Sequence, residues 1–356
     1  MSKTAVILFN LGGPDSPEAI EPFLFNLFSD PAILDMPRMI RWLVAKMIVK
    51  RRISRTRAIY GKVSHSSPIV HATEMQAKAL ETVLHNHEET IRVFPAMRYW
   101  HPFINTVAHD VKQWSPDTIV LLPLYPQFST TTTESSMKEW TRVMMGTKIP
   151  TLAICCWPVE PKWILAVADL TQESLNKLQK CSVNRVTAIS PRILFSAHAL
   201  PEHIIARGDP YQHQVEQTAM ALAAALKWSD GDYKVCYQSR VGSGRWIGPA
   251  TVDLVRQAGS ENVPIVLVPI TFVSEHSETL VELDIEYRHV AKEAGVPAYI
   301  RVPTVGTHPY FIAGLADMVR EAQARLSQGL EGLYGQGEIC HCPPLRKCCA
   351  SSKKMT

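Results

Sequence analysis

The sequence predicts an α/β protein with two doubly wound domains, each built on a parallel sheet. Short runs of β-branched and aliphatic residues alternate with longer helix-compatible segments, which is the pattern of βαβ units. These runs are apolar on both faces, as strands are when helices cover both sides of a sheet. The length of 356 residues fits about two domains of roughly 150 residues each.

The predicted elements follow one another along the chain as strands separated by helices. Short apolar runs predict strands at residues 5–11, 91–95, 118–122, 151–155, 192–197, 234–237, 264–268 and 298–302. Longer segments predict helices at residues 74–85, 213–227, 250–258, 277–294 and 309–326. In the last helix, Phe311, Leu315 and Met318 recur at spacings of three and four, which gives it one apolar face.

An internal repeat supports two similar halves. Residues 7–9 recur as residues 193–195, and the apolar pattern of residues 119–124 recurs at 265–270. The first half is longer, and its surplus falls within about residues 18–64, which have no counterpart after Pro201. Two such sheets would place the carboxyl ends of their strands at a cleft, where open α/β folds bind ligands.

Composition and charge exclude several classes of protein. Apolar residues make up 46% and charged residues 20%, which fits a globular chain and excludes a disordered one. The net charge of +4 is small and scattered, so no nucleic-acid partner is expected. Arg41 and Lys46 interrupt the most apolar stretch, and no export signal is visible. We therefore expect a cytoplasmic protein whose eight cysteines are reduced thiols or metal ligands.

The insertion at about residues 18–64 has two open interpretations. Its apolar residues at 23–28 and 36–48 are followed by Lys50-Arg51-Arg52. It could be a helical hairpin packed on its own domain. It could instead be an apolar lip beside the cleft that dips into a membrane surface, with the basic cluster meeting anionic lipid. The second interpretation predicts peripheral contact with the inner face of a membrane.

Polar residues gather where four predicted strands end. These segments are residues 10–14, 97–102 with Arg98 and Tyr99, 196–201 with His198, and 274–278. His198 stands where active-site residues of open α/β folds are found, although a structural histidine is the competing interpretation. Ser196 is no hydrolase nucleophile, because no G-x-S-x-G elbow surrounds it and it points the same way as His198 on a strand.

A row of carboxylates follows the strand at 264–268. Glu278, Glu282 and Glu286 recur at every fourth position, and His276 comes just before them. On an α-helix these three carboxylates would lie on one face and repel one another, unless bound protons or cations neutralise part of their charge. A solvated acidic face is the competing interpretation. Histidine with carboxylates suits ferrous iron, whereas a structural zinc site favours cysteine.

A glycine-rich segment at residues 242–248 comes close to a dinucleotide-binding fingerprint. Its spacing is one residue too long, and no acidic residue follows at the expected distance. Nicotinamide binding is therefore a weak alternative.

Ordered blocks of the chain match the signature of one family. They are residues 10–14, 125–129, 194–201, 207–211, 237–242, 246–249 and 272–287. The sequence resembles the ferrochelatases over about residues 4–328. The resemblance implies insertion of ferrous iron into protoporphyrin IX, the last step of haem synthesis, by a metal-inserting lyase.

The same resemblance implies the domain organisation. Two Rossmann-like doubly wound parallel-sheet domains would face each other across a cleft that holds the porphyrin, which is the chelatase fold. The first domain would cover residues 1–160, with the lip at about 18–64, and a helix at about 305–328 would complete it. The second would cover residues 161–304 and carry the catalytic motifs. Residues 329–356 would form a cysteine-rich extension.

The resemblance also assigns candidate site residues. His198 matches the active-site histidine and Glu278 the carboxylate opposite it, while His276, Glu282 and Glu286 match a neighbouring acidic path, so all five are candidate metal contacts. The candidate porphyrin contacts are Leu11, Arg51, Arg52, Ser67, Arg98, Tyr99, Tyr125 and Trp246. Leu11 stands where users of protoporphyrin tend to have an apolar residue and users of coproporphyrin a tyrosine, which favours protoporphyrin.

The chemistry agrees with these residue types. Metal insertion removes two pyrrole N–H protons, and a neutral imidazole accepts a proton at cellular pH. We expect His198 to take these protons while Glu278 and the row carry protons or iron. The reverse assignment, with His198 as a metal ligand and Glu278 as the base, stays open. A non-catalytic tetrapyrrole or metal carrier is the alternative class, but a carrier needs no base.

The last residues of the chain are rich in cysteine. Cys340, Cys342, Cys348 and Cys349 have the pattern C-x-C-x₅-C-C, which can hold an iron–sulfur cluster or zinc. Some ferrochelatases carry a [2Fe–2S] cluster in a C-terminal extension, so the resemblance favours the cluster over zinc or an unstructured thiol tail. The sequence leaves the oligomeric state undetermined.

Overall fold

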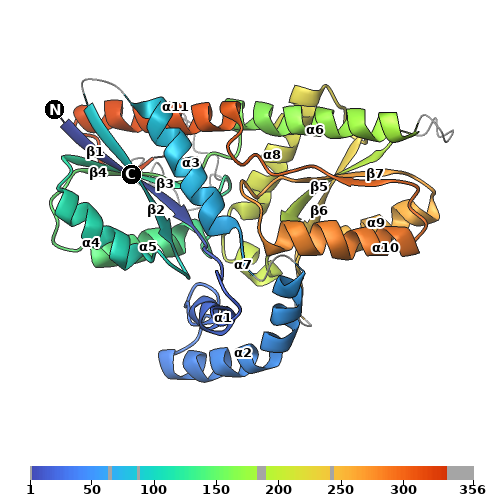
Figure 1. The fold of residues 1–356 in the computed structure, drawn as a ribbon, viewed down its shortest axis with the longest axis horizontal. Coiled ribbons are helices and arrows are strands. Elements are labelled where there is room, and N and C mark those ends of the chain that lie inside the picture. The colour runs from blue at the N-terminus through green and yellow to red at the C-terminus, as the bar shows by residue number, and fades with distance from the viewer. Residues whose placement is uncertain (1, 63–65, 86–88, 183–189, 241–243, 335–356) are drawn as a thin grey trace. The chain divides into compact units, whose positions relative to one another are not determined.

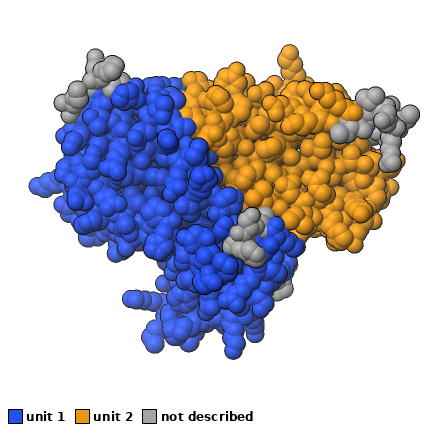
Figure 2. All heavy atoms as spheres, viewed as in Figure 1, with its two compact units in different colours: residues 1–157, 315–340, 349–356 blue, residues 158–314, 341–348 orange. Residues whose placement is uncertain are grey.

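The computed structural model describes residues 2–62, 66–85, 89–182, 190–240 and 244–334. These residues form two compact units, coloured separately in Figure 2. The first contains residues up to Trp157 and those from Leu315 onward, and the second contains Pro158–Gly314. The division passes through helix α11 (Pro309–Ser327), which contributes to both.

The first unit contains a five-stranded parallel sheet in the order β2-β1-β3-β4-β9 (Figure 1). Its strands are β1 (Ser2–Asn10), β2 (Glu89–Met97), β3 (Thr118–Pro123), β4 (Thr151–Ile154) and β9 (Gly332–Tyr334). Helices α3 (Ile69–Leu84), α4 (Ile104–Trp114) and α5 (Thr133–Val143) connect them. Residues 5–9 of β1 are fully buried, because the strand is central in the sheet.

The C-terminal part of α11 belongs to this first unit. Gln323 donates hydrogen bonds from Nε2 to Thr4 Oγ1 at 3.2 Å and to Glu89 Oε2 at 2.8 Å. These contacts join the C-terminal end of α11 to the beginnings of β1 and β2.

The insertion forms two helices of the first unit, α1 (Ile20–Phe28) and α2 (Arg38–Gly61). Their contact is a small apolar cluster of Ile20, Leu24, Val49 and Tyr60. The first half of α2 leaves large apolar side chains exposed: Met39, Ile40, Trp42, Leu43 and Met47. No helix in the described part of the chain is long and apolar enough to cross a membrane.

The second unit contains a four-stranded parallel sheet in the order β6-β5-β7-β8. Its strands are β5 (Arg192–His198), β6 (Tyr233–Gln238), β7 (Ile265–Pro269) and β8 (Tyr299–Arg301). Its helices are α6 (Pro161–Ser182), α7 (Glu202–Ala206), α8 (Tyr211–Leu226), α9 (Thr251–Ser260) and α10 (Tyr287–Glu293), with a π-helix, η1 (Glu278–Glu286), directly before α10.

The predicted α/β class with two parallel sheets is confirmed. The two halves of the sequence repeat fall on β1 with β5 and on β3 with β7, and each pair holds the same place in its sheet. The prediction of one α-helix over residues 277–294 is wrong in its first half, where the backbone is π-helical. The three-residue strand β9 was not predicted, because so short a run shows no periodicity.

Candidate active site

His198 is the last residue of β5 and leaves the sheet at the carboxyl ends of its parallel strands. Its Nδ1 lies 2.6 Å from the carbonyl oxygen of Ala199. A carbonyl only accepts hydrogen bonds, so Nδ1 carries the hydrogen and Nε2 of the neutral ring has a free lone pair. That Nε2 lies 3.6 Å from Oε1 of Glu278, the first residue of the π-helix.

His276 faces the other oxygen of the same carboxylate. Its Nδ1 lies 3.1 Å from the carbonyl oxygen of Ser274, which fixes the same tautomer by the same argument. Its Nε2 lies 3.7 Å from Glu278 Oε2. The Glu278 carboxylate therefore lies between two imidazole nitrogens that can each bind a proton or a cation.

Glu278 is held in its ionised form by these neighbours. Burial raises the pKa of Glu278, but the charges that His198 and His276 carry when protonated outweigh burial and lower it to about 2. Its Oε2 is buried and accepts no hydrogen bond from the described residues. The carboxylate therefore stays negative at neutral pH, with an oxygen that a proton or metal ion could use.

Glu282 has a different environment from the one predicted. Its Oε1 accepts hydrogen bonds from the Ser239 N–H and the Tyr287 hydroxyl, each at 2.8 Å, and its Oε2 accepts one from the Ser239 hydroxyl. Burial and the charge of Glu278 raise the pKa of Glu282 in spite of these hydrogen bonds. Glu282 is thus anchored by donors close to Glu278.

The predicted α-helical row of carboxylates is corrected by this arrangement. Glu278 pairs with the two histidines, Glu282 binds Ser239 and Tyr287, and the half-buried Glu286 ends the π-helix. Ser239 was missed as a functional candidate. It has a φ of 62°, a left-handed conformation that is uncommon outside glycine and that places both its donors on Glu282.

In the first unit, the predicted contacts Arg98 and Tyr99 belong to a buried polar network around Asp30. Arg98 Nη2 lies 2.8 Å from Asp30 Oδ2, and the Tyr99 hydroxyl donates to the same oxygen at 2.9 Å. Ser135 donates to Asp30 and accepts from Arg98 Nε at 2.8 Å. Burial and the charge of Asp30 raise the pKa of Tyr99. The network joins the segment after α1 to the end of β2 and to α5.

The segment that follows β1 binds Tyr99 through Leu11 and Ser67 through Pro14. The Leu11 carbonyl accepts the Tyr99 N–H at 2.9 Å, and the Ser67 N–H donates to Pro14 at 2.7 Å. A Cβ on Gly13 would lie 2.5 Å from both the Cβ and Oγ of Ser67, so the close approach requires glycine.

The other predicted porphyrin contacts come from three different parts of the chain. Tyr125 is buried after β3. On α2, Arg51 is exposed, and the half-buried Arg52 lies 5.3 Å from the ring of Phe28. Burial and the charge of Arg55 lower the pKa of Arg52. Trp246 is half-buried in the second unit, and its indole N–H has no acceptor among the described residues.

No set of three or more His, Cys, Asp and Glu side chains among the described residues is arranged to hold a metal ion. Cys340, Cys342, Cys348 and Cys349, the candidate cluster ligands, lie outside the described residues.

Comparison with known proteins shows what the chain resembles. The family model described as Ferrochelatase matches residues 3–323. A ferrochelatase of Caulobacter vibrioides is 49% identical over 325 residues, 90% of each chain. A ferrochelatase of Pelagibacter ubique is 43% identical over 357 residues, which cover 99% of this chain and 98% of the relative.

Solved structures share the fold at much lower identity. SirB from Bacillus subtilis with Fe3+ matches with a TM-score of 0.55 at 11% identity, covering 93% of this chain and 99% of SirB. The sirohydrochlorin chelatase SirB in complex with cobalt matches with a TM-score of 0.53, also at 11% identity. These likenesses support the predicted chelatase fold.

Proposed function

This chain belongs to the ferrochelatase family, whose members insert iron into a porphyrin for haem synthesis, and we propose that its substrates are ferrous iron and protoporphyrin IX. In this proposal His198 accepts the pyrrole protons, and Glu278 stabilises the charged imidazole and guides iron. The observation that carries the proposal is the Glu278 carboxylate between the Nε2 atoms of His198 and His276.

The tautomer of His198 supports its role as the base. With its Nδ1–H held by the Ala199 carbonyl, only Nε2 is available to take a proton. Protonation would place a positive charge 3.6 Å from the Glu278 carboxylate, which stabilises the imidazolium. The reverse assignment is disfavoured, because a carboxylate whose pKa is lowered to about 2 is a weak base at neutral pH.

The same groups suit transient contact with the iron substrate. Imidazole nitrogen and carboxylate oxygen are suitable ligands for ferrous iron. Iron that must pass to the porphyrin needs only a partial set of protein ligands, because the porphyrin nitrogens supply the rest. We therefore assign His276 and Glu278 to iron contact, with Glu282 and Glu286 on the path toward them.

The remaining candidates are proposed to bind the macrocycle. Leu11, Tyr99, Tyr125 and Trp246 offer apolar or aromatic contact, Ser67 offers a hydroxyl, and Arg51, Arg52 and Arg98 offer cations for the propionates. Arg98 is already paired with Asp30, so Arg51 and Arg52 are the better candidates for the propionate charges.

The experiment is metal insertion by a His198→Ala variant. Under anaerobic conditions with ferrous iron, wild type should consume N–H protoporphyrin and form haem. The variant should be slower by about 100- to 10,000-fold, the range for loss of a general base, and should keep its porphyrin affinity. His289→Ala is the matched control, because His289 forms an exposed pair with Glu293 at 3.1 Å in the same unit.

Two outcomes would contradict this proposal. Near-normal turnover by His198→Ala would remove His198 from the chemistry. Binding of iron and porphyrin by wild type without loss of the N–H porphyrin spectrum would indicate the carrier function instead.

We also propose peripheral membrane contact through the exposed apolar side of α2, from the cytoplasmic face. Met39 and Leu43 are 82% and 61% exposed, and basic residues such as Arg41 and Lys46 alternate with them. Apolar side chains flanked by cations suit the surface of an anionic bilayer. Leu43→Glu should weaken co-sedimentation with anionic vesicles, whereas Leu165→Glu, an exposed leucine of the second unit, should not.

For the cysteine-rich tail we propose a [2Fe–2S] cluster bound by Cys340, Cys342, Cys348 and Cys349. The support is the spacing of these residues and the resemblance. Visible absorption of freshly purified protein that disappears in Cys348→Ser would support the cluster. Stoichiometric zinc or a colourless, metal-free protein would contradict it.

A further inference from the structure

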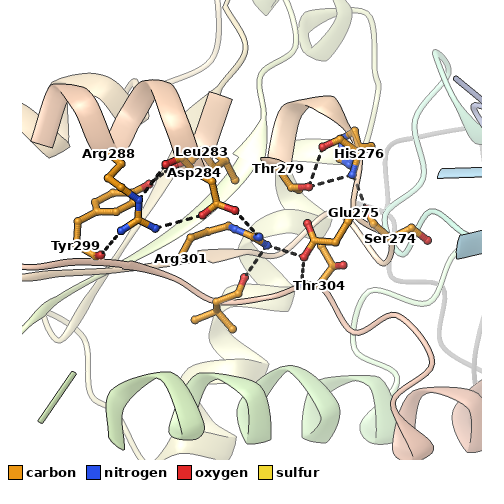
Figure 3. Close-up of polar contacts among 11 residues, drawn as sticks. Ser274, Glu275, His276, Thr279, Leu283, Asp284, Arg288, Tyr299, Arg301 and Thr304 are labelled. Atoms are coloured by element: carbon orange, nitrogen blue, oxygen red, sulfur yellow. Dashed lines mark hydrogen bonds and ion pairs between the residues drawn. The ribbon is translucent and has the colours of Figure 1, made fainter. Parts of the chain in front are cut away.

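Arg301, the last residue of β8, is a buried arginine that binds two carboxylates. Only 7% of its side chain is exposed. Its Nη1 donates to Glu275 Oε1 at 2.7 Å, and its Nη2 donates to Asp284 Oδ2 at 2.6 Å. Figure 3 shows the guanidinium between the two acids. The Arg301 side chain thus binds one residue just before His276 and one residue after Glu282.

Tyr299 of β8 and Thr304, which follows the strand, make further contacts at the two ends of the segment of residues 275–284. On the Glu275 side, the Thr304 N–H donates to Glu275 Oε1 at 3.0 Å. On the Asp284 side, the Tyr299 hydroxyl donates to the carbonyl oxygen of Leu283 at 2.7 Å. These bonds and those of Arg301 connect β8 and the residues just after it with the approach to the π-helix and with its second half (Figure 3).

The segment between Glu275 and Asp284 contains residues that are proposed to act on the substrates. His276 and Glu278 lie between Glu275 and Asp284, as does Glu282. A π-helix is rare, and the positions of its side chains differ from those on an α-helix. The distances from the Glu278 carboxylate to the two imidazole rings therefore depend on the contacts that keep this segment π-helical.

Stability alone does not explain a buried arginine here. Replacing a complete buried ion cluster with neutral groups is often neutral or stabilising, whereas removing one partner is costly. A guanidinium can instead fix the positions of its partners, because this planar group donates hydrogen bonds to two acceptors in fixed directions.

We propose that Arg301 is a positioning residue for iron insertion. By binding Glu275 and Asp284 it holds the π-helical segment so that Glu278 stays between His198 and His276. This inference rests on the proposed function, and it adds a residue that lies behind the site and needs no contact with substrate.

The first test compares Arg301→Met with Arg301→Lys. We expect Arg301→Met to lower kcat/KM for ferrous iron on the order of 100-fold, as misplacement of a reacting group does, with porphyrin affinity unchanged. Lysine reaches one carboxylate at a time and should restore part of the loss. Arg192→Met is the matched control, because Arg192 pairs with Glu261 at the opposite end of β5 from His198.

A second variant separates positioning from stability. Arg301→Met alone removes the shared counter-charge of two half-buried carboxylates and should lower the melting temperature. The triple variant Arg301→Met, Glu275→Gln, Asp284→Asn removes those charges and should recover the melting temperature while kcat/KM for iron stays low. Recovery of both together would overturn the proposal.

A double-mutant cycle gives the remaining readout. If Arg301 acts through Glu278, the losses from Arg301→Met and Glu278→Asp should be strongly less than additive in kcat/KM. Additive losses would overturn the inference. Failure of wild type to insert iron would instead contradict the proposed function, so the two failures are distinguishable.

Discussion

Glu278 Oε1 lies 3.6 Å from His198 Nε2, although the two residues come from a π-helix and from the end of a strand. Because the His198 tautomer leaves a lone pair on Nε2, the neutral imidazole and the ionised carboxylate present two acceptors to each other. Such a pair is best satisfied when a proton or a cation lies between its members. This requirement matches a reaction that releases protons and consumes a metal ion.

We predict that Glu278→Gln lowers kcat for iron insertion by about 100-fold or more, the scale of losing a charge that stabilises a developing cation. The amide has nearly the same shape, so porphyrin affinity should stay close to wild type. Initial rates of haem formation at saturating porphyrin measure the effect. A loss confined to the KM for porphyrin would contradict the assignment of Glu278 to proton and iron handling.

The pKa values of the two neighbouring glutamates should separate on titration. The pKa of Glu282 is raised by burial and by the Glu278 charge, whereas that of Glu278 is lowered to about 2. As the pH falls, Glu282 should therefore take up a proton first while Glu278 stays ionised. Carboxyl carbon chemical shifts followed by NMR against pH measure this order.

The same titration has an internal control. In Glu278→Gln the like charge beside Glu282 is gone, so the pKa of Glu282 should fall. An unchanged or higher pKa would mean that the two carboxylates do not interact.

The sequence predicts the sheets better than it predicts the site. The strands at residues 5–11 and 264–268 were recognisable because helices cover both faces of a parallel sheet and leave the strands apolar throughout. His198 and Glu278 were candidates from their positions after predicted strands, and the roles that the resemblance implies for them stay predictions. The π-helix was not predicted, because glutamates at every fourth position fit an α-helix equally well.

The supporting contacts could not be predicted for a different reason. Arg301 binds Glu275 and Asp284 because β8 lies in the sheet next to β7, and this is a tertiary relationship with no local sequence signal. Ser239 binds Glu282 in a left-handed backbone conformation, and a serine in the sequence does not predict that conformation. Asp30 and Arg98 likewise meet only in the folded unit.

Asp30 offers a last prediction, in the first unit. Its carboxylate is 2% exposed and accepts hydrogen bonds from Arg98, Tyr99 and Ser135. Asp30→Asn would leave the half-buried Arg98 guanidinium without its counter-charge, at a cost of about 3 kcal/mol in the free energy of unfolding, the lower end for breaking a buried pair. If Arg98 contacts the porphyrin as proposed, its release should also raise the KM for porphyrin. Urea unfolding and steady-state kinetics measure the two effects, and Asp15→Asn, at an exposed position, should change neither. Wild-type stability in Asp30→Asn would show that the network contributes little to holding the segment after α1 against β2.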